Sequence, residues 1–215
     1  MDNILNRPFY NKFAYAFDSI ITAPVPQRCD FIEDILSKHG IHSGSSILDA
    51  ESGTGNYAIE LAKRGYNVTG VDISPELIQI AIKKATSSEN LVFKQENLLE
   101  LVGSHKYSAI LCRGVLNDFI YYNDRKDIFM VFFRLLLQDG VLIFDVRDWD
   151  LTLIRKKENP IFRKTVTIEN RTLTFQSISK LNVAQHIIEV HEVHAIDEES
   201  QEYKFRMRCW TKKRS

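Results

Sequence analysis

The stretch that decides the fold is Ile47-Leu48-Asp49-Ala50-Glu51-Ser52-Gly53-Thr54-Gly55-Asn56. It begins as a short apolar strand and places two glycines where that strand must turn sharply into a helix. Glycine allows backbone conformations with positive φ and lets a ligand approach the main chain closely. Ligands of open α/β sheets bind beyond the carboxyl ends of the strands. The stretch therefore predicts a ligand-binding turn.

Strands and helices alternate around this turn. A helix over 30–38 ends at Gly40, and further helices are predicted at 57–64, 74–85 and 124–137. The predicted strands are 46–50, 67–72, 91–95, 108–112 and 141–146, the last one following Gly140. Continuous apolar strands that alternate with helices predict a doubly wound, mostly parallel, Rossmann-like sheet that is covered on both faces.

The region after residue 150 follows a different pattern. Runs rich in β-branched residues at 165–169, 172–181, 187–196 and 203–211 are separated by turn sequences, which predicts an antiparallel β insertion near the C-terminus. We therefore expect three parts. They are an N-terminal helical cap (1–40), a Rossmann-like cofactor-binding domain (41–150) and an antiparallel β subdomain (151–215).

Composition and charge limit the functions that the chain can have. Its 215 residues carry 28 Lys plus Arg against 28 Asp plus Glu, whereas nucleic-acid binders usually have a basic excess. No apolar run approaches ~18 residues and the N-terminus lacks a basic-then-apolar signal, so we expect a cytoplasmic protein without a membrane partner. The three cysteines form no CxxC pair. His186, His191 and His194 lack a zinc-site spacing, so we interpret them as strand-surface residues and expect no metal.

Two classes of ligand are compatible with the glycine pattern. Residues 53–58 fit the dinucleotide fingerprint G-x-G-x-x-A, which would suit an NAD-binding oxidoreductase. Asp49 and Glu51 argue against it, because two carboxylates repel a pyrophosphate but attract a cationic sulfonium and its α-amino group. Asp72 ends the second strand, where it can accept hydrogen bonds from both ribose hydroxyls. Alternatively, Asp72 caps the helix that begins at Ser74.

With these residues the chain resembles the class I S-adenosylmethionine-dependent methyltransferases, over about residues 40–150. Residues 47–56 look like the family's first motif and VTGVDIS (68–74) like its second. QENL (95–98) looks like the third-strand motif, and RLLLQDGVLIFDV (134–146) is similar to the helix end that leads into the fifth strand. The β-rich region further resembles the small-molecule subgroup of glycine and sugar N-methyltransferases, in which an antiparallel insertion helps to roof the substrate pocket.

The resemblance implies S-adenosylmethionine as the cofactor and a small-molecule methyl acceptor that is methylated at nitrogen or oxygen. The resemblance implies that the first strand and its loop shape the methionine end of the cofactor pocket and that Asp72 holds the ribose. It also implies that Ile73, Asn97 and Leu98 surround the adenine. The full set of implied cofactor-binding residues is Tyr10, Asp49, Glu51, Gly53, Gly55, Asp72, Ile73, Asn97, Leu98, Cys112 and Arg113.

Three features depart from the family's pattern. Glu51 stands in place of the first glycine, so its side chain must point away from the cofactor or meet its amino group. Asn97 replaces the usual Asp, and its carbonyl can still accept a hydrogen bond. The chain ends at Ser215, apparently lacking the last two strands, which leaves the fifth strand as an edge. A natural short form, a truncated chain or a homodimer contact would each account for this.

The loop 114–123 is where we expect substrate contacts, because the acceptor must be placed in line with the methyl group. The catalytic candidates are Asn117, Asp118 and Tyr121, which can accept a proton or position the acceptor, or simply cap the next helix. Arg147 is either a ligand for a substrate carboxylate or a surface charge, and Trp149 would contact an apolar face of the substrate.

Other functions stay open from sequence alone. One is a protein that keeps the methyltransferase fold and the cofactor but has no catalytic activity, and another is the NAD-binding oxidoreductase. A nucleic-acid methyltransferase is disfavoured by the zero net charge and by CRGV (112–115), which stands where an (N/D)PP(Y/F)-type motif would follow the fourth strand.

Overall fold

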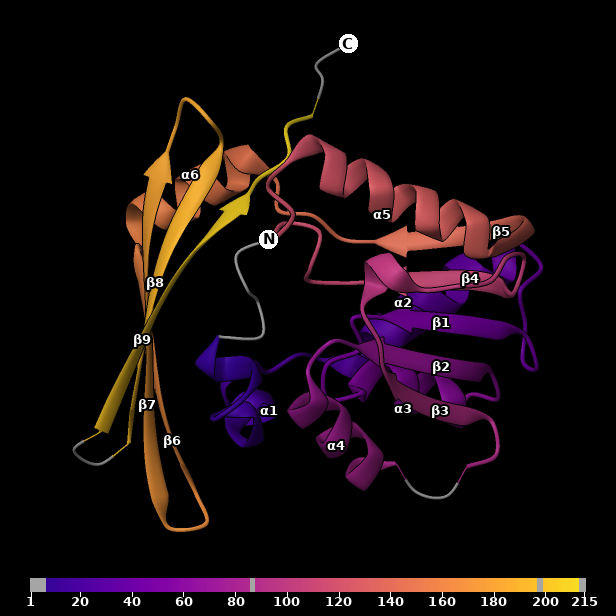
Figure 1. The fold of residues 1–215 in the computed structure, drawn as a ribbon, viewed down its shortest axis with the longest axis horizontal. Helices are drawn as coiled ribbons and strands as arrows, with labels where there is room; N and C mark the ends of the chain where they lie inside the picture. The colour runs from indigo at the N-terminus through magenta and orange to yellow at the C-terminus, as the bar shows by residue number, and fades with distance from the viewer. Residues whose placement is uncertain (1–6, 86–87, 197–198, 213–215) are drawn as a thin grey trace. The chain divides into compact units, whose positions relative to one another are not determined.

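The computed structural model describes residues 7–85, 88–196 and 199–212 (Figure 1). The chain divides into two compact units. The Rossmann unit consists of Ala23–Arg113 and Asn123–Asp145, and the β unit consists of Met1–Thr22, Gly114–Tyr122 and Val146–Ser215. The three-part division that the sequence predicts stays a prediction, and the compact units divide the chain at other positions.

The Rossmann unit contains a parallel sheet of five strands in the order β3-β2-β1-β4-β5 (Figure 1). Its strands are β1 (Ser46–Ala50), β2 (Asn67–Asp72), β3 (Leu91–Gln95), β4 (Tyr107–Cys112) and β5 (Leu136–Phe144). The strand order reverses between β1 and β4, so the carboxyl end of β1 lies at the switch point where such sheets bind ligands. The predicted parallel sheet is confirmed, and among the described residues it ends at β5.

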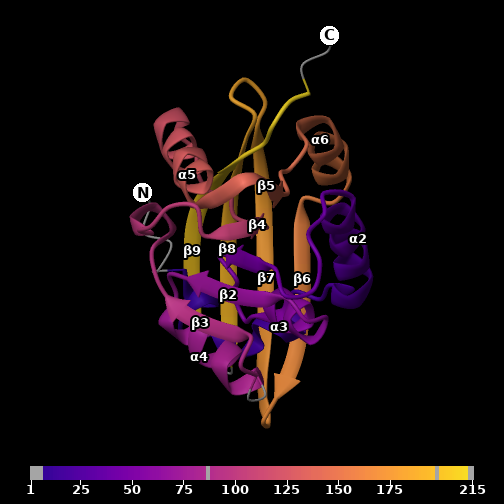
Figure 2. The same cartoon turned by 90° about the vertical axis from the view of Figure 1, so that its right-hand side faces the viewer.

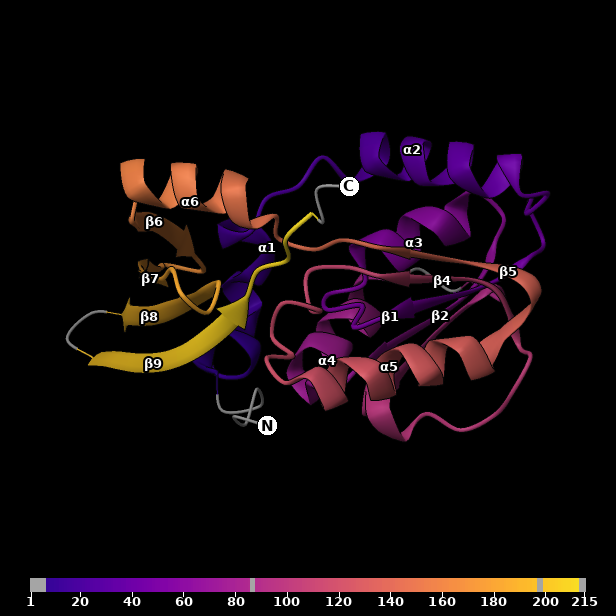
Figure 3. The same ribbon diagram turned by 90° about the horizontal axis from the view of Figure 1, so that it is seen from above.

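Helices cover both faces of this sheet. Figure 3 shows α2 and α3 on one face and α4 and α5 on the other. The bounds are α2 (Val25–Lys38), α3 (Asn56–Lys63), α4 (Pro75–Lys84), η4 (Leu98–Glu100) and α5 (Tyr122–Leu135). Between α2, α3 and the sheet lies a core that includes Leu36, Ile47, Leu61, Val68 and Leu111. This core fixes the positions of β1 and α3, which flank the glycine turn.

Several element boundaries differ from the prediction. The sequence pattern predicts a helix that ends at 137 and a strand at 141–146, whereas α5 ends at Leu135 and β5 begins with the next residue. Apolar residues run through this junction without a polar break, so periodicity does not mark the change. Helix α2 begins at Val25 rather than Asp30, because Pro26 is tolerated in a first helical turn.

The β unit is built on an antiparallel sheet in the order β6-β7-β8-β9, and Figure 2 shows these four strands side by side. Its strands are β6 (Ile161–Ile168), β7 (Arg171–Asn182), β8 (Ile187–Ile196) and β9 (Glu199–Arg208). Glu169 and Asn170 join β6 to β7 with φ of 50° and 64°. Two left-handed residues are what a tight two-residue hairpin loop requires. The predicted antiparallel insertion is confirmed.

Short helical segments cover one face of the antiparallel sheet. The N-terminal ones are η2 (Pro8–Tyr10), η3 (Ala14–Ala16) and α1 (Phe17–Ile20). They bury Phe9, Phe13 and Ile20 against Leu173 and Phe175 of β7.

Helix α6 (Trp149–Glu158) precedes the first strand predicted for the β subdomain, in a segment for which no helix is predicted, so that part of the prediction is incomplete. It packs Trp149 against Ile188 and Val190 of β8, and the Asp148 carboxylate caps it by accepting a hydrogen bond from the Leu151 N–H at 2.9 Å. No helix within the described ranges has the length and apolar character needed to cross a membrane.

Candidate cofactor site and acceptor pocket

The glycine turn after β1 is held in an unusual backbone conformation. Glu51, Gly53 and Gly55 have φ of 60°, 57° and 76°, in the left-handed region that favours glycine. A Cβ on Gly55 would lie 2.5 Å from Cζ of Phe93 and 2.9 Å from Cβ of Ala81, whereas a Cβ on Gly53 would meet open space. Gly55 therefore serves packing, whereas no neighbour lies against the Cα of Gly53, and its contact with the cofactor stays a prediction.

Glu51 adopts the conformation that the family's first glycine would provide, although it carries a side chain. It is half-buried, and its positive φ is uncommon for a residue with a Cβ. Backbone strain of this kind is found preferentially at functional sites. Its contact with the cofactor stays a prediction.

Asp72 ties the glycine turn to the end of β2. Its Oδ2 accepts a hydrogen bond from the Gly53 N–H at 2.8 Å, and its Oδ1 accepts one from the Ser74 N–H at 2.9 Å. Burial raises the pKa of Asp72, and hydrogen bonds from the main chain act in the opposite direction. Ser74 caps α4 through a hydrogen bond from the Leu77 N–H to its Oγ at 3.1 Å. Asp72 therefore shapes the turn, and its bond to a ribose stays a prediction.

Asp49, near the end of β1, is a buried carboxylate with an unused acceptor. Only 4% of its surface is exposed, and its Oδ2 has no hydrogen-bond partner. Burial raises the pKa of Asp49 to about 7 and Asp72 adds to the rise, while Arg113 and the Ala58 N–H act against it. A buried acceptor without a donor is costly, so this site is suited to receive a cationic amine.

Arg113, just after β4, offers the opposite charge. Its guanidinium lies 4.2 Å from the centre of the Tyr57 ring and donates a hydrogen bond to Oδ2 of Asp145 at 3.2 Å. Its Nη1 is buried without a partner. Asp49 and Arg113 thus present an acceptor and a donor, as the ammonium and carboxylate of an amino-acid moiety require. The methionine end of the predicted cofactor fits these residues.

The residues predicted to surround the adenine have local structural roles as well. Asn97 caps η4, because its Oδ1 accepts a hydrogen bond from the Leu99 N–H at 3.1 Å, and its Nδ2 donates to Oε1 of Glu100 at 2.9 Å. Leu98 is buried and Ile73 is half-buried. Their contacts with an adenine stay predictions.

Cys112, at the end of β4, is a fully buried thiol. Its side chain has no exposed surface, and its contact with the cofactor stays a prediction. Burial raises the pKa of the Cys112 thiol well above its ordinary value, and Glu51, Asp145 and Asp49 add to the rise. The thiol is therefore held neutral and inert.

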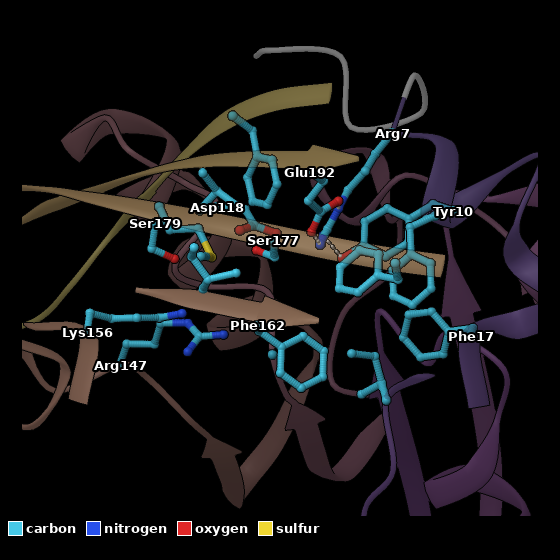
Figure 4. Close-up of a pocket in the computed structure, with 18 of the residues that line it drawn as sticks. Arg7, Tyr10, Phe17, Asp118, Arg147, Lys156, Phe162, Ser177, Ser179 and Glu192 are labelled. Atoms are coloured by element: carbon cyan, nitrogen blue, oxygen red, sulfur yellow. Dashed lines mark hydrogen bonds and ion pairs between the residues drawn. The ribbon is translucent and has the colours of Figure 1, made fainter. Parts of the chain in front are cut away.

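A second site is a pocket of about 590 Å³ that lies within the β unit (Figure 4). Strands β7, β8 and β9, the N-terminal segment, the loop after β4 and α6 all contribute to its lining. Pockets of this size typically bind small organic molecules. Tyr10 lines this pocket, and its contact with the cofactor stays a prediction.

The three predicted catalytic candidates have different surroundings. Asp118 lines the pocket, and burial raises its pKa to about 6, with Glu192 adding to the rise. Asn117 is buried, and its Oδ1 accepts a hydrogen bond from the Arg147 N–H at 2.8 Å, so it holds the loop in place. Tyr121 is 59% exposed and does not line the pocket. Asp118 is therefore the candidate that the fold brings to the pocket.

Sequence reasoning missed Arg7 and Glu192. Glu192 is 2% exposed and pairs with Arg7, whose Nε donates to Oε2 of Glu192 at 2.8 Å and whose Nη2 donates to Oε1 (Figure 4). The Arg7 guanidinium lies between the rings of Tyr10 and Phe205, at 4.5 Å and 4.4 Å from their centres. The sequence does hold a signal for Glu192. It lies two residues after Val190 on β8, so strand alternation places it on the same, inward face.

Two of the three histidines, His186 and His194, differ from the prediction that they are strand-surface residues, and His191 agrees with it. His194 is fully buried, with its ring stacked on Phe13 at 5.2 Å and its Nε2 3.5 Å from Oε2 of Glu192, because even-numbered residues of β8 face inward. His186 lies in the turn before β8, not on the strand, with φ of 53°. His191 is on the outward face and pairs with Glu202 at 2.9 Å. Within the described ranges, no three Asp, Glu, His or Cys side chains cluster as metal ligands.

A family of methyltransferase domains matches residues 41–211. The chain belongs to this methyltransferase family. It is 36% identical over 140 residues to a putative methyltransferase, YqeM, of Bacillus subtilis (strain 168), a match that covers 64% of this chain and 55% of the relative. It is 32% identical over 153 residues to a glycine/sarcosine N-methyltransferase of Aphanothece halophytica, a match that covers 67% of this chain and 56% of that relative. The methyltransferase chain thus spans little more than half the length of these relatives.

Solved structures show the same fold. A S-adenosylmethionine-dependent methyltransferase from Clostridium acetobutylicum ATCC 824 matches with a TM-score of 0.72 at 19% identity, covering 94% of this chain and 82% of that one. The sugar N-methyltransferase KedS8 from Streptoalloteichus sp ATCC 53650 matches with a TM-score of 0.69 at 19% identity. This match covers 92% of this chain and 78% of that one. The predicted family and fold class are therefore confirmed for this methyltransferase.

Proposed function

We propose that this chain is a S-adenosylmethionine-dependent methyltransferase that methylates a small molecule at nitrogen or oxygen. The observation that carries the proposal is the buried Asp49 with its unpartnered Oδ2 beside the glycine turn. A carboxylate in this position attracts the α-amino group of the cofactor and repels the pyrophosphate of a dinucleotide. The glycine/sarcosine and sugar N-methyltransferases among the similar proteins support a small-molecule acceptor.

In this proposal Gly53 presents its bare main chain to the cofactor, Asp49 and Arg113 bind the ammonium and carboxylate of the methionine moiety, and Asp72 binds the ribose. Bound S-adenosylmethionine supplies an electrophilic methyl group and leaves as a neutral thioether. The protein's contribution is placement, because in-line displacement depends on how the nucleophile is oriented.

Asp118 accepts the proton of the acceptor in this mechanism. Its pKa of about 6 leaves it mostly ionised at neutral pH while keeping it a stronger base than an ordinary Asp. An acceptor nitrogen or oxygen must lose a proton when it is methylated, and the Asp118 carboxylate would accept that proton. Arg7 pairs with the neighbouring Glu192, so Glu192 does not compete for this proton.

The test of cofactor binding is a thermal unfolding experiment with S-adenosylmethionine or its demethylated product. Ligand at about one hundred times its Kd stabilises the folded state by about 2.7 kcal/mol, so we expect a clear rise in Tm. No rise at millimolar ligand, or a rise with NAD alone, would contradict the proposal.

The test of Asp118 needs an acceptor found by screening amines, hydroxy acids and sugars. We expect kcat/KM to rise with pH to a plateau above about pH 6. Asp118→Asn should lower kcat by about a hundredfold and remove this rise. Asp150→Asn, an exposed change on α6, is the matched control.

A cytoplasmic location, the absence of nucleic-acid and membrane partners, and a homodimer remain predictions.

A further inference from the structure

Besides Arg7, which pairs with Glu192, three cations line the pocket of the β unit: Arg147, Arg155 and Lys156. Arg155 and Lys156 come from the last turn of α6, and Arg147 comes just before that helix. Figure 4 shows the side chains of Arg147 and Lys156 close together. In the part of the chain that the structure describes, none of the three lies within ion-pair distance of a carboxylate. The pocket therefore holds an excess of positive charge at this point.

This excess is unfavourable for the protein alone. Burial lowers the pKa of Lys156, and the neighbouring Arg155 and Arg147 lower it further. Like charges that approach one another in a partly desolvated pocket raise its energy, and an anion between them removes that cost. The cluster is thus suited to a negatively charged ligand group.

The acidic residues of the same pocket do not cancel this charge. Glu192 is already neutralised by its paired hydrogen bonds from Arg7. Arg147 acts to lower the pKa of Asp118, but the two side chains form no ion pair among the described residues. The hydroxyls of Ser177 and Ser179, which also line the pocket, provide neutral donors for an anion.

The rest of the pocket is apolar. Aromatic rings contribute to its lining, among them Phe17, Phe162, Phe175 and Phe205. A volume of about 590 Å³ is in the range that holds drug-sized ligands, so an amino acid as small as glycine would leave most of it unfilled. The ligand must therefore combine an anionic group with an apolar body.

We infer that the methyl acceptor carries an anionic head group, a carboxylate or a phosphate, on an apolar or aromatic body, and that Lys156, Arg155 and Arg147 bind this head group. The inference rests on the proposed function, because it names the acceptor of that reaction. Charge-assisted hydrogen bonds from Lys and Arg hold such groups strongly. The apolar body packs against the aromatic rings.

The experiment measures binding of three small probes to the full chain by calorimetry. Phenylacetate and phenyl phosphate carry the two kinds of head group, and phenylacetamide is the uncharged match to phenylacetate. We expect at least one anionic probe to bind about tenfold or more tightly than the amide and to weaken with added salt. The ratio between carboxylate and phosphate identifies the head group. Equal affinity for phenylacetate, phenyl phosphate and the amide would overturn the inference.

Two neighbouring lysines provide a matched pair of variants. Lys156→Gln should weaken the better anionic probe by about tenfold or more, whereas Lys157→Gln, an exposed change one residue along α6 that lies outside the pocket, should leave it unchanged. Equal effects of the two changes would contradict the inference. If Lys156→Gln fails to fold, the comparison of probes on the unchanged protein decides.

Titration with S-adenosylmethionine separates this inference from the proposed function. Cofactor binding without any preference for anionic probes overturns the head-group assignment alone. Binding of anionic probes without any cofactor binding overturns the proposed function, and with it the identification of the ligand as a methyl acceptor. We expect both to bind, and cofactor affinity to be the same in both lysine variants.

Discussion

The two units treat their buried charges in opposite ways. In the Rossmann unit the buried carboxylate of Asp49 has an unpartnered oxygen. In the β unit the buried carboxylate of Glu192 is held by Arg7, whereas the half-buried Lys156 and the exposed Arg155 form no ion pair among the described residues. A charge that is removed from water is usually paired in proteins, so an unpaired buried or half-buried charge suits a ligand group of the opposite sign. The difference indicates an ammonium group at one site and an anionic group at the other.

The same difference shows in the pKa values. Burial raises the pKa of Asp49 to about 7. Burial also acts to raise the pKa of Glu192, but the contacts with His194 and Arg7 outweigh it and lower the value below the ordinary one. Removing an unpaired acid and removing a paired one should therefore change stability in opposite directions.

The largest expected effect comes from the turn that positions Asp49. Gly55→Ala combines a left-handed backbone with a Cβ 2.5 Å from Phe93, so it should lower the free energy of unfolding by about 4 kcal/mol. Gly53→Ala has the same kind of backbone but open space around its Cβ, and should cost about 1–2 kcal/mol. Urea unfolding of both variants measures this, and equal losses would show that packing at Gly55 does not fix the turn.

The next effect concerns the paired acid. Glu192→Ala leaves the Arg7 guanidinium buried without its partner and should lower the free energy of unfolding by about 3 kcal/mol at pH 7. The pKa of Glu192 is lowered in the folded protein, so this loss should fade as the pH falls below the ordinary value of 4.5.

Glu202→Ala is the control for the paired acid. Its carboxylate is 60% exposed and pairs with His191 on the outward face, so its loss should change little. If the two substitutions cost the same, the Arg7–Glu192 pair does not hold the N-terminal segment.

The smallest expected effect is a rise in the free energy of unfolding, where the preceding substitutions lower it. In the protein without ligand, Asp49→Asn should raise the free energy of unfolding by about 2 kcal/mol at pH 8 and leave it unchanged at pH 3. The folded protein binds the Asp49 proton more tightly than the unfolded chain, so stability falls as the pH rises from 3.8 to about 7. The amide of Asn does not titrate, so the Asp49→Asn protein does not lose stability over this pH range. Exposed Asp127→Asn should show no such pH dependence, and destabilisation by Asp49→Asn at pH 8 would contradict the account.

The fold and the cofactor turn were predictable because they depend on local sequence. Asp49, the two glycines and Asp72 stand at strand ends that the apolar pattern marks, and a parallel sheet brings such ends together. The pocket was less predictable. Arg7, Glu192 and Lys156 are distant in sequence, and only the antiparallel sheet with its covering helices brings them together.

Helix α6 shows the same limit. The sequence 149–158, WDLTLIRKKE, carries a short apolar half and a run of cations, so its periodicity is weak beside the β-branched strands that follow. Its N-terminal signal was Asp148, which caps the helix. Because Arg155 and Lys156 lie on this helix, the anionic preference of the pocket could not be predicted without it.

The most direct test of the account is calorimetry of S-adenosylmethionine binding at pH 7 in buffers of different ionisation enthalpy. Pairing with the cofactor's ammonium should lower the pKa of Asp49 from about 7, so binding should release about half a proton per protein. Asp49→Asn should bind more weakly and release none. Binding of NAD in place of S-adenosylmethionine, or the same proton release in the Asp49→Asn protein, would contradict the claim that this buried carboxylate receives the cofactor.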